Sequence, residues 1–203
     1  MVMPTLPIIF PNEKSEDMTS IGKVLWEVEI TKESVVKQIM TVKNKVNLGF
    51  IGFRDGENKF TYPRFDEEKV NALFAAVGEL CDYLIVDCTS SLSNPITGAA
   101  VKTARQVIRL ASPDLSSVSF FSSQLRLYSD PAYWLNEQIT GLNTPDSDLF
   151  MPIEEAKKRI PDIRFTIPYC REVKHQMLDG KLYAEVADKK FNEKLRAIAE
   201  KVV

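Results

Sequence analysis

The chain has 203 residues, of which 44% are hydrophobic and 27% are charged, and this composition excludes a disordered chain. The 26 Lys and Arg nearly balance the 28 Asp and Glu, which leaves a formal charge of -2 and excludes binding to nucleic acid by overall positive charge alone. The length predicts one domain over residues 1–203.

Cysteine usage and the N-terminus indicate where such a chain resides. The three cysteines do not have the number or spacing of a disulfide framework or a four-ligand zinc site, and Cys88, in an apolar run, is expected to be buried. No apolar stretch approaches the roughly 18 residues that cross a bilayer. The prolines among the first eleven residues do not fit a signal peptide. These observations predict a cytoplasmic protein.

The first fifty residues are predicted to hold short elements. Residues 1–20 lack hydrophobic periodicity and are expected to be a loop. Apolar residues at helical spacing predict a helix over 21–28, capped by Ser20, and a second helix from Thr31 to about Met40. Residues 46–53 alternate and run into a turn, which indicates a strand.

A strong helical pattern over 66–80 is followed directly by a continuous apolar run that ends in an acid at 83–87. Because this run does not alternate, it is typical of a strand buried on both faces of a parallel sheet. Asn94 and Pro95 then begin another helix, as cap and first helical residue.

Strands and helices continue to alternate to the end of the chain. The predicted strands are 106–111, 138–142 and 163–167, and the predicted helices are 115–128, 153–160, 171–179 and 187–202. This order predicts a doubly wound α/β fold, with a mostly parallel sheet and helices on both faces.

The end of the run 83–87 is the sharpest candidate for chemistry. Ligands of open parallel sheets bind beyond the carboxyl ends of the strands. Asp87 lies at such an end, and hydroxyl groups follow it at Thr89, Ser90 and Ser91. A carboxylate there suits a Mg²⁺ ion that is held mostly through water. The alternative is an acid that only ends a strand and caps the next loop.

The segment from Asp82 to Val118 resembles the middle of ParA/MinD-type P-loop ATPases, which position plasmids, chromosomes, division sites or pili. Their Walker B strand ends in Asp and runs into a switch loop. A helix follows, and then a strand that ends in a Thr/Ser-Pro-Asp type of loop. The resemblance implies that Asp87 holds Mg²⁺ through water and that Thr89, Ser90 and Ser91 belong to the switch loop.

Two later segments resemble the base-binding side of the same family more loosely. The strand that ends at Asn143 resembles the one that ends in a base-contacting Asn, and residues 164–169 resemble the strand and loop on the other side of the adenine. The resemblance implies that Asn143, Pro168 and Tyr169 border the adenine. For the complete protein it implies ATP and Mg²⁺, a homodimer and a protein partner, and it leaves DNA and membrane open as the matrix.

The chain departs from the family at the phosphate loop. Nucleotide-binding members carry K-G-G-x-G-K-[ST], whereas the eight glycines here are all isolated from any G-K-[ST]. The first seven residues resemble the loop after the family's second strand. We therefore expect an N-terminally truncated P-loop NTPase-like domain without its first strand and P-loop helix. The chain alone is expected to show no ATP binding that calorimetry can measure.

Three interpretations remain open, and none of them assigns a catalytic residue. The first is a ParA/MinD-type ATPase that positions or partitions DNA or a cell-surface machine, present here without its Walker A loop. The second is a non-catalytic, degenerate relative that acts as an interaction or localisation module in pilus or secretion assembly. The third is a structural α/β domain with no link to nucleotides.

Overall fold

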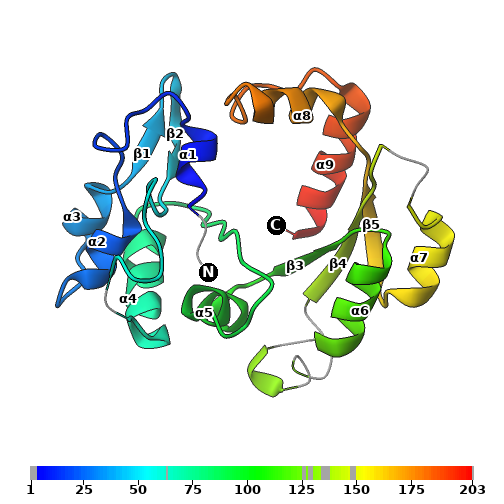
Figure 1. The fold of residues 1–203 in the computed structure, drawn as a ribbon, viewed down its shortest axis with the longest axis horizontal. Coiled ribbons are helices and arrows are strands. Elements are labelled where there is room, and N and C mark those ends of the chain that lie inside the picture. The colour runs from blue at the N-terminus through cyan, green and yellow to red at the C-terminus, as the bar shows by residue number, and fades with distance from the viewer. Residues whose placement is uncertain are drawn as a thin grey trace. The chain divides into compact units, whose positions relative to one another are not determined.

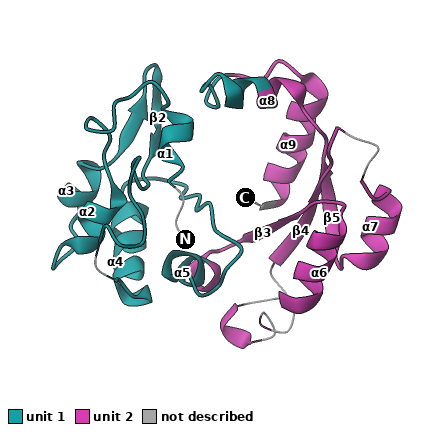
Figure 2. Cartoon of the chain, in the orientation of Figure 1, with its two compact units in different colours: residues 1–100, 175–184 teal, residues 101–174, 185–203 magenta. Residues whose placement is uncertain are grey.

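The computed structural model describes residues 4–62, 64–124, 127, 130–133, 138–146 and 150–202 (Figure 1). The chain divides into two compact units (Figure 2). Unit 1 holds residues 1–100 and 175–184, and unit 2 holds residues 101–174 and 185–203. Each unit has its own cluster of buried apolar side chains.

The core of unit 1 forms around α4 (Glu67–Gly78), which confirms the helix predicted over 66–80. Val70 and Leu73 lie on one face of α4 and are almost completely buried. Asp66 caps the helix, because its carboxylate accepts the Lys69 N–H at 3.0 Å. The other helices that lie wholly or mainly in this unit are α1 (Leu6–Ile9), α2 (Ile21–Trp26), α3 (Lys32–Val36) and α5 (Pro95–Thr103).

The prediction that residues 1–20 form a loop is wrong in part. They contain the short helix α1, with Pro7 in its first turn, where the N–H that proline lacks has no helical partner to lose. Leu6 of this helix is buried. The predicted cap of α2 is confirmed, because the Ser20 side chain accepts the Gly22 N–H at 3.1 Å.

The helix predicted from Thr31 to Met40 is too long. The helix α3 ends at Val36, and Met40 opens a strand, β1 (Met40–Val42), which pairs antiparallel with β2 (Lys45–Phe50). Asn44 closes this hairpin with φ 67°, in the left-handed region that Asn tolerates. The strand predicted at 46–53 is therefore half of a hairpin and is not part of the parallel sheet.

The strand predicted at 83–87 is wrong as an assignment. The segment belongs to no sheet of the described chain, and Tyr83 and Ile85 are 68% and 91% exposed. The apolar composition shows which surroundings the segment suits, but a strand also needs a neighbour to accept and donate its hydrogen bonds. The described residues provide no such neighbour.

Unit 2 contains a parallel sheet of three strands in the order β3-β4-β5. Its strands are β3 (Val107–Ala111), β4 (Gln138–Asn143) and β5 (Ile163–Ile167). The helices of this part of the chain are α6 (Leu115–Gln124), α7 (Ile153–Arg159), α8 (Arg171–Leu178), which continues into unit 1, and α9 (Lys189–Val202), with a short 3-10 helix, η2 (Pro131–Tyr133). The 3-10 helix was not predicted. Each of the other elements agrees with its prediction within a few residues, except that residues 125, 126 and 128 of the predicted helix 115–128 lie outside the described residues.

Helices cover both faces of this sheet, with α9 on one face and α6 and α7 on the other (Figure 1). Leu142 and Ile160 are completely buried on the side of the sheet that α6 and α7 cover. Position 141 must be glycine, because a Cβ there would lie 2.2 Å from the ring of Phe165 on the adjacent strand. The predicted α/β class with a parallel sheet is confirmed.

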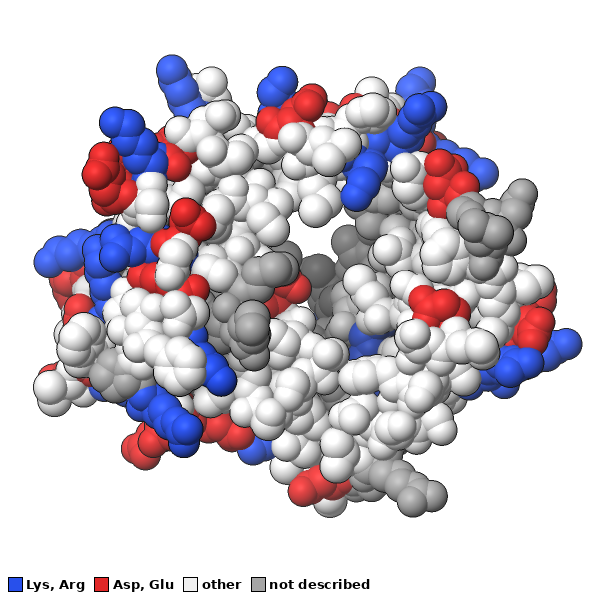
Figure 3. All heavy atoms as spheres, in the orientation of Figure 1, with Lys and Arg blue, Asp and Glu red and all other residues white. Residues whose placement is uncertain are grey.

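None of the helices in the described residues has the length and hydrophobicity needed to span a bilayer. On the face shown in Figure 3, basic and acidic side chains are interspersed. This mixture agrees with the balanced composition.

Candidate functional site

The loop after Asp87 is fixed to the first turn of α5 by hydroxyl groups. Thr97 is 3% exposed, and its Oγ1 accepts the Thr89 N–H at 3.2 Å and lies 3.1 Å from the Thr89 Oγ1. Ser91 Oγ lies 2.7 Å from Ser93 Oγ. The loop that follows the carboxylate of Asp87 is therefore anchored at Thr89, whereas Asp87 itself is exposed to solvent.

The start of α5 sets the position of Thr97. The Asn94 Oδ1 accepts the N–H groups of Ile96 and Thr97, at 2.9 and 3.3 Å, and Pro95 takes the first helical position. This confirms the capping predicted from the Asn94-Pro95 pair. One cap thus orders both the helix and the residue that holds the preceding loop.

Cys88 lies between Asp87 and Thr89 in sequence. The prediction that it is buried is wrong, because the residue is exposed. The protein around its thiol still removes part of its hydration, which raises the pKa of Cys88 above its ordinary value. The hydrogen bond with Thr97 lowers this pKa and the Asp87 carboxylate raises it. The thiol therefore stays protonated near neutral pH, which does not favour a nucleophilic role.

The donor groups at this loop suit a hydrated magnesium ion. The described residues contain no group of three or more His, Cys, Asp and Glu side chains that could enclose a metal. Asp87 offers an exposed carboxylate, and Ser90 and Ser91 are exposed beside it in sequence. Because Mg²⁺ prefers oxygen ligands and keeps several water molecules, this donor set fits an ion held through water.

The predicted base-side residues lie at the carboxyl ends of β4 and β5 in unit 2. Asn143 ends β4 and pairs in register with Ile167, which ends β5. Just beyond, Thr144 donates both its N–H and its Oγ1–H to the carbonyl of Ile167, at 2.9 and 2.8 Å. These two hydrogen bonds to one carbonyl oxygen hold the ends of β4 and β5 together. Asn143 is exposed at the end of β4, and Pro168 follows the end of β5.

Pro168 is half-buried and Tyr169 is exposed, and Cys170, which follows them, is buried. The structure therefore brings the strand ends that carry Asn143 and Pro168 side by side, as the sheet topology predicts. That these residues contact a base stays a prediction.

The Ser-Pro-Asp loop after β3 has a structural role in the same unit. The Asp114 Oδ1 accepts the Ser117 N–H at 2.7 Å, and the Ser117 Oγ accepts the Ser112 N–H at 3.0 Å. Asp114 therefore caps α6. Both hydrogen bonds join a backbone N–H to a side chain, and they tie the loop after β3 to the first turn of α6.

The predicted site residues fall into two sets. Asp87 and the hydroxyl residues 89–91 belong to unit 1, whereas Asn143 and residues 168–169 belong to unit 2. The structure brings the members together within each set.

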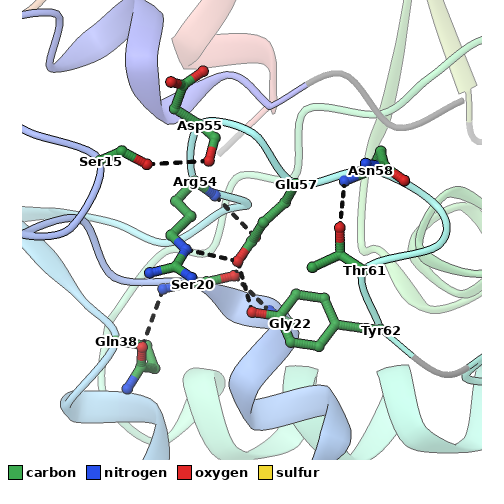
Figure 4. A network of polar contacts seen from close by, with 10 residues as sticks. All are labelled: Ser15, Ser20, Gly22, Gln38, Arg54, Asp55, Glu57, Asn58, Thr61 and Tyr62. Atoms are coloured by element: carbon green, nitrogen blue, oxygen red, sulfur yellow. Dashed lines mark hydrogen bonds and ion pairs between the residues drawn. The ribbon is translucent and has the colours of Figure 1, made fainter.

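The sequence reading missed a buried carboxylate in unit 1 (Figure 4). Glu57 is 6% exposed. One carboxylate oxygen accepts the Ser20 Oγ–H at 2.6 Å and the Arg54 N–H at 3.1 Å. The other accepts the Arg54 Nε–H at 3.0 Å and the Tyr62 Oη–H at 2.6 Å. The only signal was a charged turn sequence, and composition alone does not reveal that a turn folds over its own carboxylate.

Tyr62 shares this environment. Burial and the hydrogen bond to Glu57 raise the pKa of its phenol above the ordinary value. Its ring packs against α2 at Gly22, where an added Cβ would lie 2.1 Å from the ring. The network joins α2 to the turn at residues 54–58 and is best explained as structural.

No family model and no curated protein matches this chain. Solved structures that are similar to it in fold include a ParA family ATPase and two MinD proteins. A ParA family ATPase from Chlorobium tepidum TLS has a TM-score of 0.71 at 18% identity and covers 90% of this chain and 74% of its own. The MinD cell division protein of Aquifex aeolicus has a TM-score of 0.66 at 17% identity, over 98% of this chain and 81% of its own.

The septum site-determining protein MinD of Pyrococcus horikoshii OT3, solved in complex with Mg-ADP, has a TM-score of 0.63 at 14% identity. It covers 98% of this chain and 79% of its own. The chain therefore has the ParA/MinD-type, P-loop NTPase-like α/β fold, as the resemblance implied.

Proposed function

We propose that this chain carries the base side and the magnesium side of a ParA/MinD-type nucleotide site and lacks the part that binds phosphate. In the complete protein, such a site belongs to an ATPase that dimerises and positions or partitions DNA or a cell-surface machine. The observation that carries the proposal is the register of β4 and β5, which sets Asn143 beside the residues that follow Ile167.

The chemistry of the base side supports this proposal. An Asn amide offers a donor and an acceptor, and the edge of an adenine has a complementary pair. Pro168 fixes its φ and turns the chain away from the sheet, and the exposed ring of Tyr169 adds an apolar surface. In unit 1, Asp87 is the group that would hold the water shell of Mg²⁺.

The phosphate side does not fit this sequence. Gly22-Lys23 lies inside α2, and Gly180-Lys181 follows α8, with Gly180 at φ 64°. Neither pair is followed by Ser or Thr, so neither can form the loop whose N–H groups surround a phosphate. We assign no hydrolytic step to this chain, and we propose that the loop belongs to additional polypeptide.

An NMR titration of the ¹⁵N-labelled chain with adenosine tests the base side. Binding is expected at roughly millimolar concentration, because one amide and one ring surface supply little energy. Amide shifts are expected at residues 143, 144, 167 and 169, since Pro168 has no amide proton. Asn143→Ala should abolish them, and Asn47→Ala, a matched change at an exposed Asn of β2, should not. Unchanged spectra at saturating adenosine would contradict the proposal.

The second candidate is a degenerate interaction module for pilus or secretion assembly, and the isolated glycines favour it. The DNA sequence upstream of the Met1 codon distinguishes the two. An in-frame G-x-G-K-[ST] about 30–40 codons before Met1, one βαβ step away, supports the ATPase. A stop codon there supports the module.

A further inference from the structure

The dipeptide Asp-Gly occurs at Asp55-Gly56 and at Asp179-Gly180, and both pairs belong to unit 1. An Asp side chain can react with the main chain at such a pair, because glycine has no Cβ to shield its nitrogen from the side-chain carboxyl carbon. The reaction requires a glycine nitrogen that is free of hydrogen bonds and a carboxyl group that can rotate toward it. The two pairs are equivalent in sequence, so a difference between them comes from the fold.

The pair Asp55-Gly56 is open to this reaction. It forms the corner of a turn in which the Glu57 N–H donates to the Arg54 carbonyl at 3.3 Å, with Gly56 at φ 78°. Asp55 and Gly56 are both exposed. No described residue accepts the Gly56 N–H or binds the Asp55 carboxylate. In Figure 4 this carboxylate points away from Glu57, and Ser15 donates only to the Asp55 carbonyl, at 3.2 Å.

The pair Asp179-Gly180 is closed to the same reaction, although Gly180 has a similar φ of 64°. It directly follows α8, and the Gly180 N–H donates to the Met177 carbonyl at 3.4 Å. Gly180 is buried, and a Cβ on it would lie 2.0 Å from the ring of Pro11. The Gly180 nitrogen therefore has an acceptor and close packing around it, and it reaches the Asp179 carboxyl carbon only when this end of the helix opens.

We propose that Asp55 is a site of spontaneous covalent modification, at which the chain isomerises to isoaspartate, and that Asp179 is protected. The Gly56 nitrogen forms a bond to the Asp55 side-chain carboxyl carbon. One carboxyl oxygen leaves as water, with the amide proton and a second proton from solvent. Water then opens the five-membered imide at the main-chain carbonyl, which leaves Gly56 joined through the Asp55 side chain. The mass is unchanged, and no oxidant or reductant takes part.

The isomerised turn has one more carbon atom in its main chain, and this turn holds the buried carboxylate of Glu57. In the intact turn, Arg54 donates its N–H and its Nε–H to Glu57 at 3.1 and 3.0 Å. Because both bonds depend on the short path between Arg54 and Glu57, the added carbon displaces one residue from the other. The modification of an exposed residue therefore reaches the network that joins α2 to this turn. This inference does not depend on the proposed nucleotide site.

Prolonged incubation of the purified chain at neutral pH, followed by proteolysis and electron-transfer mass spectrometry, tests the proposal. Fragment ions distinguish isoaspartate from aspartate at each position. Isoaspartate should form about tenfold faster at Asp55 than at Asp179, because Gly180 must first give up its hydrogen bond and its packing. In the chain unfolded by guanidinium chloride, the two rates should agree within about twofold, since neither nitrogen is then held.

The matched variant is Asp55→Glu. It keeps the charge at an exposed position, but the longer side chain has to close a six-membered ring, so isomerisation at this position should stop. After equal incubation, the wild type should contain a fraction that unfolds at a lower urea concentration, and this fraction should be the one that carries isoaspartate at position 55. The Asp55→Glu chain should contain no such fraction.

Three results would overturn the proposal. Equal rates at Asp55 and Asp179 in the folded chain would show that the fold does not protect Gly180. A folded chain without isoaspartate at position 55, when both sites react in the unfolded chain, would show that Gly56 is held as firmly as Gly180. An isolated isoaspartate form with the urea midpoint of the unmodified chain would show that the turn does not transmit the change to Glu57.

Discussion

Glu57 is the carboxylate whose hydrogen bonding the structure defines most completely. Four donors from three residues surround it: Ser20, which caps α2, and Arg54 and Tyr62, which lie on either side of Glu57 in sequence. The caps at Ser20 and Asn94 could be predicted, because a cap depends on a few neighbouring residues. Glu57 could not, because its burial depends on contacts with a residue 37 positions away in sequence.

Glu57→Ala should destabilise the chain by about 3 kcal/mol, because it leaves Ser20, Tyr62 and the partly buried Arg54 without their shared acceptor. Urea denaturation measures the loss. The control is Glu16→Ala, since Glu16 forms an exposed ion pair with Lys14 at 3.9 Å, and its removal should cost about 0.5 kcal/mol or less. Equal losses in both variants would contradict the structural role of Glu57.

The raised pKa of Tyr62 predicts a loss of stability at high pH. The unfolded chain releases the phenolic proton at a lower pH than the folded chain does, so the contribution is complete below about pH 10, the ordinary value, and declines as pH rises further. The difference in unfolding free energy between the wild type and Tyr62→Phe should be constant from pH 7 to 9 and shrink above pH 10. A difference that grows with alkaline pH would contradict the direction of the shift.

At the scale of elements, the strands and helices after residue 100 could be predicted, because each has its own period and end signals. The hairpin β1–β2 was missed at its first strand, since apolar residues at 35, 36, 39 and 40 also satisfy a helical spacing. At residues 83–87, by contrast, the sequence predicts a strand that the structure does not form. Their composition predicts a buried strand, but pairing depends on a neighbour that lies outside the sequence pattern.

The sheet of unit 2 offers a test of packing at Gly141. Gly141→Ala should cost about 2 kcal/mol, because the new methyl group overlaps the ring of Phe165 unless the strands shift. Phe165→Leu in the same chain should recover part of that loss by removing the ring. Additive losses in the double variant, measured by thermal unfolding, would show that the two side chains do not meet.

For the whole molecule, the order of elements along the chain was enough to predict the α/β class. The parallel sheet of unit 2 confirms it, and the ParA and MinD structures share the fold. The positions of Asn143 and Pro168 followed from strand ends and could be predicted. The relation of Asp87 to a sheet could not, because the apolar segment that precedes it belongs to no sheet of the described residues. The function stays a proposal, since a shared fold hosts more than one activity.

We propose that the chain has the base side of a nucleotide site without its phosphate side. The most direct test compares the affinities of adenosine and of ATP with Mg²⁺ for the same chain by NMR titration. The two should agree within about threefold, at roughly millimolar dissociation constants, because the phosphates gain no contacts. ATP that binds at micromolar concentration, and loses this affinity in Asp87→Ala, would contradict the claim.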